Sequence, residues 1–195
     1  MSRMESIIMN MLCSGNPNHN TVASAVKSYF PKANFASRAT GYDLRFWDSG
    51  SETHFREQII NYDVFVNSSF ICGGGQLALL EATHEEWAKA GIHGHIINIG
   101  STSEYLGVND IQTKDQVYAK YSIQKRALRD RSLQLNGLNN IKTTHIIAGG
   151  LNDGIPEHKN WLDLTHVAET IVWVIEHPCL IPLIEIRANG LTSNE

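Results

Sequence analysis

The feature that most constrains the fold is a short apolar run that opens directly into glycine and serine. Residues 96–99 read Ile-Ile-Asn-Ile, and Gly100 and Ser101 follow at once. A short apolar run closed by turn residues is typical of a buried strand. Farther along, residues 118–137 have the composition of a long helix that ends in Asn-Gly, a helix-terminating signal. We therefore expect a buried strand, a turn that carries Ser101, and a long helix.

Two side chains of that helix suggest acid/base chemistry. Tyr121 and Lys125 are four residues apart, so they share one helix face. A phenol with a pKa near 10 is a poor base at neutral pH, and a nearby fixed cation lowers that pKa. Ser101, at the carboxyl end of the preceding strand, is expected to meet this pair across the crevice where open α/β sheets bind ligands.

The rest of the chain alternates strand-like and helix-like segments. Expected strands lie at residues 7–12, 33–38, 42–48, 62–69, 141–147 and 180–187, and further expected helices at 22–30, 51–60, 76–90 and 162–175. This alternation predicts a doubly wound parallel sheet of Rossmann type, with helices on both faces. Since the chain contains no long linker rich in Pro, Gly and Ser, residues 1–195 are expected to form a single domain.

These motifs resemble those of the short-chain dehydrogenase/reductase family. Ser101 and Tyr121-x-x-x-Lys125 are similar to the family's Ser and Tyr-x-x-x-Lys signature, and residues 63–67 resemble its Asp-Val-Leu-Val-Asn motif, with Asn67 as the first Asn. The resemblance implies that Tyr121 is the general acid/base and that Ser101 orients the substrate carbonyl. It also implies that Lys125 lowers the pKa of the phenol and holds the nicotinamide ribose.

The resemblance further implies a cofactor-binding turn after the first strand. The family's turn reads Thr-Gly-x-x-x-Gly-x-Gly, and the matching positions here are Ser14, Gly15, His19 and Thr21, so one of three glycines remains. Free N–H groups at the start of the following helix make a phosphate site reasonable, with Ser14, Gly15, His19 and Asn20 around it. The alternative is a plain Asn-rich turn that binds nothing.

Three other positions carry further cofactor expectations. Arg38 follows the second strand, where an acid selects the free ribose hydroxyl of NAD and an Arg accommodates the 2′-phosphate of NADP. No Asp or Glu lies between residues 35 and 41, so NADP is the preferred cofactor and NAD remains possible. By resemblance, Asp48 contacts the adenine and Gly149 lies in a loop on the nicotinamide side.

Two segments near the expected site depart from the family. Many relatives have a proton-relaying Asn near the start of the helix at residues 76–90, whereas this chain has glycines and Gln76 there. Residues 104–116 form a longer connection than usual between Ser101 and Tyr121. We interpret them as a loop at the mouth of the site.

Composition excludes several classes of protein. With 16 basic and 20 acidic residues, a net charge of −4 and no basic stripe, nucleic acid is not expected as a partner. Three cysteines without Cys-x-x-Cys spacing indicate neither a disulfide framework nor a zinc site. His93 and His95 stand two apart without a third ligand nearby, so no metal is expected.

The start of the chain indicates a cytoplasmic protein. Its apolar run, residues 7–13, is too short for the core of a signal peptide and its cleavage site, and far too short to cross a membrane. We therefore expect no membrane association. By resemblance, the two long helices before and after the Ser101 strand form the interfaces of a homodimer or homotetramer.

Three functions are compatible with these patterns. The first is an NAD(P)-dependent oxidoreductase that moves a hydride between the nicotinamide and a small carbonyl or alcohol substrate. The second is a non-catalytic relative that binds a nucleotide or a protein partner, which the missing glycines favour. The third is an unrelated α/β protein, such as a hydrolase using Ser101, although no Gly-x-Ser-x-Gly motif surrounds this serine.

Overall fold

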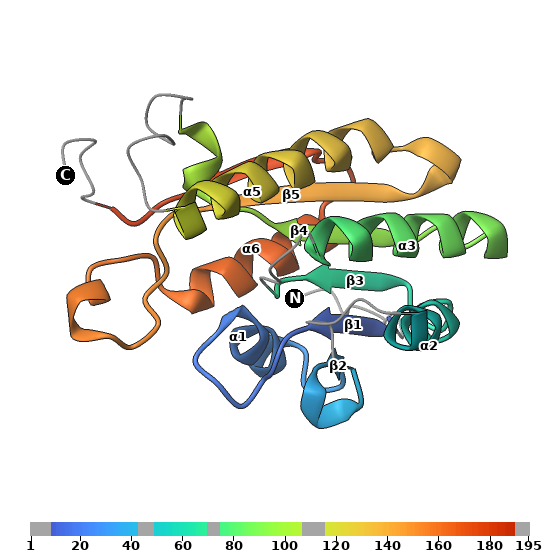
Figure 1. Cartoon of the computed structure of the whole chain (residues 1–195), viewed down its shortest axis with the longest axis horizontal. Helices are drawn as coiled ribbons and strands as arrows, with labels where there is room; N and C mark the ends of the chain where they lie inside the picture. The colour runs from blue at the N-terminus through green and yellow to red at the C-terminus, as the bar shows by residue number, and fades with distance from the viewer. Residues whose placement is uncertain (1–8, 43–48, 70–74, 107–115, 190–195) are drawn as a thin grey trace, which may run out of the picture.

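The structure is a computed structural model that describes residues 9–42, 49–69, 75–106 and 116–189 (Figure 1). The strand expected at residues 42–48 lies outside these ranges except for Tyr42, which is buried and not part of a strand. The expected cofactor residue Asp48 also lies outside the described residues.

The centre of the molecule is a parallel sheet, as the alternating sequence pattern predicted. Its strands are β1 (Met11–Ser14), β2 (Asn34–Ala36), β3 (Val64–Asn67), β4 (His95–Ile99), β5 (Lys142–Ala148) and β6 (Leu183–Ile186). Their order is β2-β1-β3-β4-β5-β6, and every neighbouring pair is parallel. The direction of winding reverses at β1, so the carboxyl ends of β1 and β3 border the kind of crevice where doubly wound folds bind ligands.

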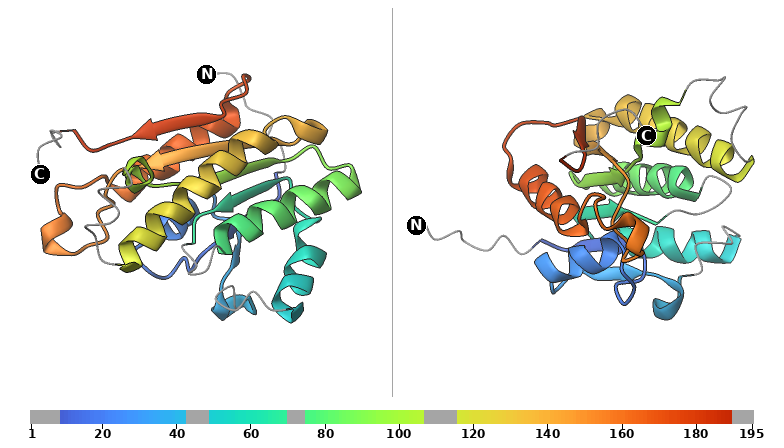
Figure 2. Two further views of the ribbon diagram at one scale, coloured as in Figure 1. Left: turned by 45° about the horizontal axis from the view of Figure 1, so that its top comes forward. Right: turned by 90° about the vertical axis from the view of Figure 1, so that its left-hand side faces the viewer.

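Helices cover both faces of the sheet, which confirms the doubly wound fold. They are α1 (Val22–Tyr29), α2 (Ser49–Ile59), α3 (Gly75–Ala90), α5 (Gln116–Leu135) and α6 (Leu164–Glu176). One apolar core joins α1 and α6 to the sheet, and a second joins α2, α3 and α5 to its other face. Figure 2 shows the two layers on either side of the strands.

The first and last observed strands are shorter than the apolar runs from which they were predicted. The first strand begins at Met11, where pairing with Val64 starts, and continues to Ser14 instead of ending at residue 12. The last strand spans only Leu183–Ile186. Strand ends depend on where a neighbour can pair, and an apolar run does not contain that information.

Candidate active site

Ser101 lies at the carboxyl edge of the sheet, just after β4. It is the N-cap of a 3₁₀ turn, η2 (Thr102–Tyr105), and its backbone is extended there. The Ser101 Oγ accepts hydrogen bonds from Ser103 N at 3.2 Å and from Ser103 Oγ at 3.0 Å. The hydroxyl is therefore held in place by acceptor contacts that leave its own proton available for donation.

Tyr121 and Lys125 reach the same place from α5. The side chains of Tyr121 and Ser101 share a hydrogen bond. The Lys125 Nζ lies 5.5 Å from the centre of the Tyr121 ring, one helical turn away. The structure therefore brings together the three residues that the sequence proposed as catalytic.

Lys125 is buried, and its ammonium is held by two oxygen acceptors. The Nζ donates to Gln76 Oε1 at 2.7 Å and to the Ile99 carbonyl at 2.7 Å. Burial lowers the Lys125 pKa from about 10.5 to about 7, and the negative charge of Glu104 partly opposes that shift. At neutral pH, Lys125 is therefore close to the midpoint of its titration.

The pKa of Tyr121 differs from the sequence expectation of a lowered value. Burial raises the pKa of this phenol above 10.0, and the hydrogen bond with Ser101 opposes the increase. The charge of Glu104 also raises it. Burial also disfavours the charged form of Lys125. The cation that was expected to lower the Tyr121 pKa therefore does not overcome the effect of burial on the phenol.

Gln76 is a residue whose role sequence reasoning missed. It lies in the first turn of α3 and is 5% exposed. Besides accepting from Lys125, its Nε2 donates to the carbonyls of Asn67 at 2.8 Å and Ile99 at 3.3 Å. A long polar side chain directly before the apolar residues 77–80 of this helix was the available signal. In this geometry Gln76 contacts Lys125 directly.

Asn67, an expected cofactor residue, lies fully buried at the end of β3. Its Nδ2 donates to the Gln76 carbonyl at 2.8 Å and to Asn98 Oδ1 at 2.9 Å on β4. The side chain thus joins two central strands to α3. A cofactor contact of Asn67 stays a prediction, and the geometry gives its side chain a structural role.

The interpretation of residues 104–116 as a loop at the mouth of the site is wrong for Glu104. Residues 107–115 lie outside the described residues, but Glu104 itself belongs to η2 and is 1% exposed. Its Oε1 accepts from Ser101 N at 3.0 Å and lies 3.1 Å from His145 Nε2 on β5. The sequence alone did not reveal this contact because His145 is 41 residues away.

The first turn contains four members of the expected cofactor site, of which one is buried, one half-buried and two exposed. Ser14 is fully buried, and its Oγ accepts from Ser68 N at 2.9 Å and from Ser69 N at 3.1 Å. Gly15 has a φ of 128°, and a Cβ there would lie 3.0 Å from the Cβ of Ala23. Both residues therefore hold the turn against α1 and the end of β3.

His19 and Asn20 are exposed on this turn, just before α1. The N-cap of α1 is Thr21, whose hydroxyl donates to the carbonyls of Asn16 at 3.3 Å and His19 at 3.5 Å. These contacts close the turn on itself at the position where the family has a glycine.

Arg38 and Gly149 follow β2 and β5 at the same edge of the sheet. Arg38 is exposed and begins the short turn η1 (Arg38–Thr40). Gly149 donates from its N–H to the Ile186 carbonyl at 2.9 Å and lies beside Arg187. The cofactor roles of Arg38 and Gly149 stay predictions.

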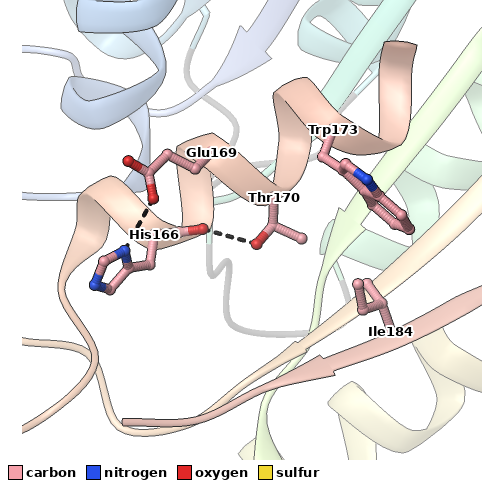
Figure 3. Close-up of a pocket in the computed structure, with 5 residues that line it drawn as sticks. All are labelled: His166, Glu169, Thr170, Trp173 and Ile184. Atoms are coloured by element: carbon pink, nitrogen blue, oxygen red, sulfur yellow. Dashed lines mark hydrogen bonds and ion pairs between the residues drawn. The ribbon is translucent and has the colours of Figure 1, made fainter. Parts of the chain in front are cut away.

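An open pocket lies beside α6, on the face of the sheet opposite to the one that α5 covers (Figure 3). It is lined by His166, Glu169, Thr170, Trp173 and Ile184, from α6 and β6. None of the proposed catalytic residues contributes to it. The pocket is therefore separate from the site at Ser101.

Two absences hold for the described ranges. No group of three or more His, Cys, Asp or Glu side chains is arranged to hold a metal ion in the described part of the chain. Among the helices of the described residues, none is both long and apolar enough to cross a membrane.

Comparison with solved structures identifies the fold. A 4-hydroxyisoleucine dehydrogenase complexed with NADH matches with a TM-score of 0.71 at 16% identity, over 95% of this chain and 100% of that one. The closed form of a serine dehydrogenase complexed with NADP⁺ matches with a TM-score of 0.69 at 18% identity, over 96% of this chain and 98% of that one. A short-chain dehydrogenase from Sphingobium yanoikuyae in complex with NADPH matches with a TM-score of 0.64 at 10% identity, over 90% of this chain and 87% of that one.

These similarities define the class of fold. The chain has the Rossmann-type fold of the short-chain dehydrogenases along nearly its whole length. No family model matches the sequence, and no curated protein matches it. The resemblance inferred from the motifs is therefore confirmed by structure, at identities that define the fold alone.

The pKa of Lys125 predicts how stability depends on pH. In the unfolded chain the amine stays protonated up to about 10.5, whereas in the folded chain it loses its proton near 7. Between these values the unfolded state binds more protons, so the free energy of unfolding gains a contribution that rises with pH. Relative to Lys125→Met, the wild type should gain about 2 kcal/mol between pH 7 and pH 9.

Urea denaturation of both proteins at the two pH values measures this difference. Lys120→Met is the matched control, because Lys120 is exposed on the same helix. A pH dependence identical in the wild type and Lys125→Met contradicts the assignment of a lowered pKa to Lys125.

Proposed function

We propose that the protein is an NAD(P)-dependent oxidoreductase of the short-chain dehydrogenase type, acting on a small carbonyl or alcohol substrate. The observation that carries this proposal is the meeting of Ser101, Tyr121 and Lys125 at the carboxyl edge of a parallel sheet. Nicotinamide cofactors appear in the names of several structures that share the fold. The fold by itself does not determine an activity, so the proposal depends on the site.

The residues present fit a dinucleotide. The N-terminus of α1 supplies N–H groups and partial positive charge, and the exposed side chains of His19 and Asn20 lie beside it. The exposed Arg38 stands at the next strand end, where it can reach a ribose phosphate. A bound nicotinamide would supply or accept the hydride.

The chain's own residues handle the proton and the carbonyl oxygen. In the direction of reduction, the Ser101 hydroxyl donates a hydrogen bond to the carbonyl oxygen and Tyr121 transfers its phenolic proton to that oxygen as negative charge develops there. Lys125, one turn along, stabilises the resulting phenolate. In the direction of oxidation, the same phenolate accepts the proton of the alcohol.

One observation favours the non-catalytic alternative. Thr21 ties the first turn together through the carbonyls of Asn16 and His19, where the family has a glycine that lets helix and strand pack closely. A relative that had lost its cofactor would tolerate this closure. Titration with NADPH separates the two functions, because the oxidoreductase must bind the nucleotide.

The first prediction from this proposed function concerns Tyr121. Tyr121→Phe should lower turnover about 100-fold or more, since it removes the general acid/base. NADPH affinity and the melting temperature should be retained, because Phe fills nearly the same volume. Turnover is measured by the absorbance of NADPH, which is consumed with a panel of carbonyl compounds and is formed from NADP⁺ with hydroxy amino acids. The names of two similar structures suggest the hydroxy amino acids.

Tyr118→Phe is the control, since the ring of Tyr118 lies 6.1 Å from that of Tyr121 and is more exposed.

In the wild type, the rate of alcohol oxidation should rise with pH through the raised pKa of Tyr121. Undiminished activity in Tyr121→Phe places the chemistry on another residue.

The second prediction concerns the choice of cofactor, for which we propose NADP over NAD. Arg38→Ala should weaken NADPH binding by about 1.5–3 kcal/mol, because it removes a charge-assisted contact with the 2′-phosphate. NADH binding should change little. Calorimetric titration with both nucleotides tests this. Lys32→Ala is the control, because Lys32 is an exposed cation that precedes the amino end of β2, whereas Arg38 follows its carboxyl end. Equal losses for both nucleotides rule out selection by Arg38.

The third prediction concerns assembly, for which we propose a homodimer or homotetramer through α3 and α5. Large apolar side chains are exposed along α5: Val117, Tyr118, Ile123 and Leu133. Burying such a surface against a second copy is favourable. Ile123→Lys combined with Leu133→Lys should shift the protein to a monomer in sedimentation velocity.

Ile60→Lys, at an exposed apolar residue just after α2, is the control for that experiment. A wild-type protein that sediments as a monomer at micromolar concentration disproves the assembly.

A further inference from the structure

We propose that Glu104 is a positioning residue for the Ser101–Tyr121–Lys125 site, with His145 and Arg129 holding its carboxylate in place. This inference deepens the proposed function and rests on it. The role would explain a buried carboxylate and imidazole directly behind Ser101.

The geometry connects Glu104 to the backbone of Ser101. Glu104 Oε1 accepts the Ser101 N–H at 3.0 Å, and the same oxygen lies 3.1 Å from His145 Nε2. The other oxygen, Oε2, lies 3.6 Å from Arg129 Nε on α5. The carboxylate thus joins the turn after β4 to both β5 and α5.

The space for this pair exists because residue 100 has no side chain. A Cβ on Gly100 would collide with His145 Nε2 and would lie 2.6 Å from Glu104 Oε1. Gly100 is also held in the sheet, because its N–H donates to the Ile146 carbonyl at 2.7 Å. The backbone at this strand end is therefore shaped around the two polar side chains.

A purely structural core has no need of such a pair. Glu104 and His145 are 1% and 0% exposed. Among the described residues, His145 Nδ1 has no hydrogen-bond partner, and Glu104 Oε2 has only the longer ion-pair contact with Arg129. Burying a carboxylate and leaving polar atoms without partners both cost stability. Apolar residues of similar size would fill the same volume without that cost.

The charged groups around His145 agree with a neutral imidazole that donates from Nε2. Glu104 faces it from η2, and Lys125 and Arg129 from α5. Burial lowers the His145 pKa, and the charges of Lys125 and Arg129 lower it further, although Glu104 opposes the shift. The neutral ring can then donate from Nε2 to the carboxylate.

The charge of Glu104 acts on both other members of the site. It raises the pKa of Tyr121 and also raises that of Lys125. Both effects favour the protonated forms. The neutral phenol is the form that donates a proton to a carbonyl oxygen, and the ammonium is the form that stabilises the phenolate left behind. Meanwhile the contact with Ser101 N fixes the residue whose hydroxyl holds that carbonyl. Glu104 therefore orients the site and maintains its proton-donating state.

The test compares Glu104→Gln with Asp130→Asn. Gln has the size of Glu and can still accept from Ser101 N, but it has no charge. Asp130 is an exposed partner of Arg129 on α5 and does not contact Ser101. The Tyr121 phenol is titrated by NMR of ¹³C-labelled tyrosine in the unliganded protein, with Tyr121→Phe to assign the signal.

We expect the Tyr121 pKa to fall in Glu104→Gln and to stay unchanged in Asp130→Asn. With a substrate that the wild type turns over, kcat for reduction should fall on the order of tenfold or more in Glu104→Gln, with NADPH affinity retained. An unchanged Tyr121 titration in Glu104→Gln, or an equal change in Asp130→Asn, overturns the inference. If the wild type has no activity, the proposed function fails while the titration still decides the role of Glu104.

A second measurement uses only the wild-type protein. The Ser101 amide proton donates to a buried carboxylate, so in the wild type it should lie downfield and exchange slowly with solvent. The amide of Asn20, on the exposed first turn, serves as the reference. A Ser101 amide that exchanges as fast as this one overturns the inference.

Discussion

The interaction on which the site depends is the pair of hydrogen bonds that hold the buried ammonium of Lys125. One partner is the side chain of Gln76 on α3 and the other is the Ile99 carbonyl at the end of β4. Lys125 itself comes from α5, so a single amino group joins two helices to the end of β4. Ser101 follows that strand by two residues, and its position relative to Tyr121 is determined by the same contacts.

The cost of this arrangement appears in the ionisation of its members. Burial lowers the pKa of Lys125 and raises that of Tyr121, so both groups are shifted toward their uncharged forms. The buried carboxylate of Glu104 favours the ammonium and the neutral phenol. A site of this kind is less stable than an apolar core of the same shape, a conflict between stability and function that is common where polar groups are buried.

The first turn keeps the glycine that packing requires. At Gly15 the positive φ and the proximity of Ala23 leave no room for a side chain. His19, by contrast, is exposed, and Thr21 replaces a glycine as the N-cap of α1 with hydrogen bonds of its own. The substitutions are therefore tolerated by the fold, and their cost, if the protein binds a dinucleotide, falls on the approach of the phosphates.

The sequence by itself determined the order of elements, the parallel sheet and the three residues at the centre of the site. Apolar periodicity and local spacing carry that information, because strand, turn and helix each depend on neighbours close in the chain. Only the tertiary structure decided the pKa of Tyr121, the hydrogen bond from Lys125 to Gln76 and the burial of Glu104 against His145. These depend on residues that are 26 to 49 positions apart, such as Lys125 and Gln76, and on how deeply the packed helices exclude water. Burial and long-range contact are properties of the packed chain, and local sequence patterns do not report them.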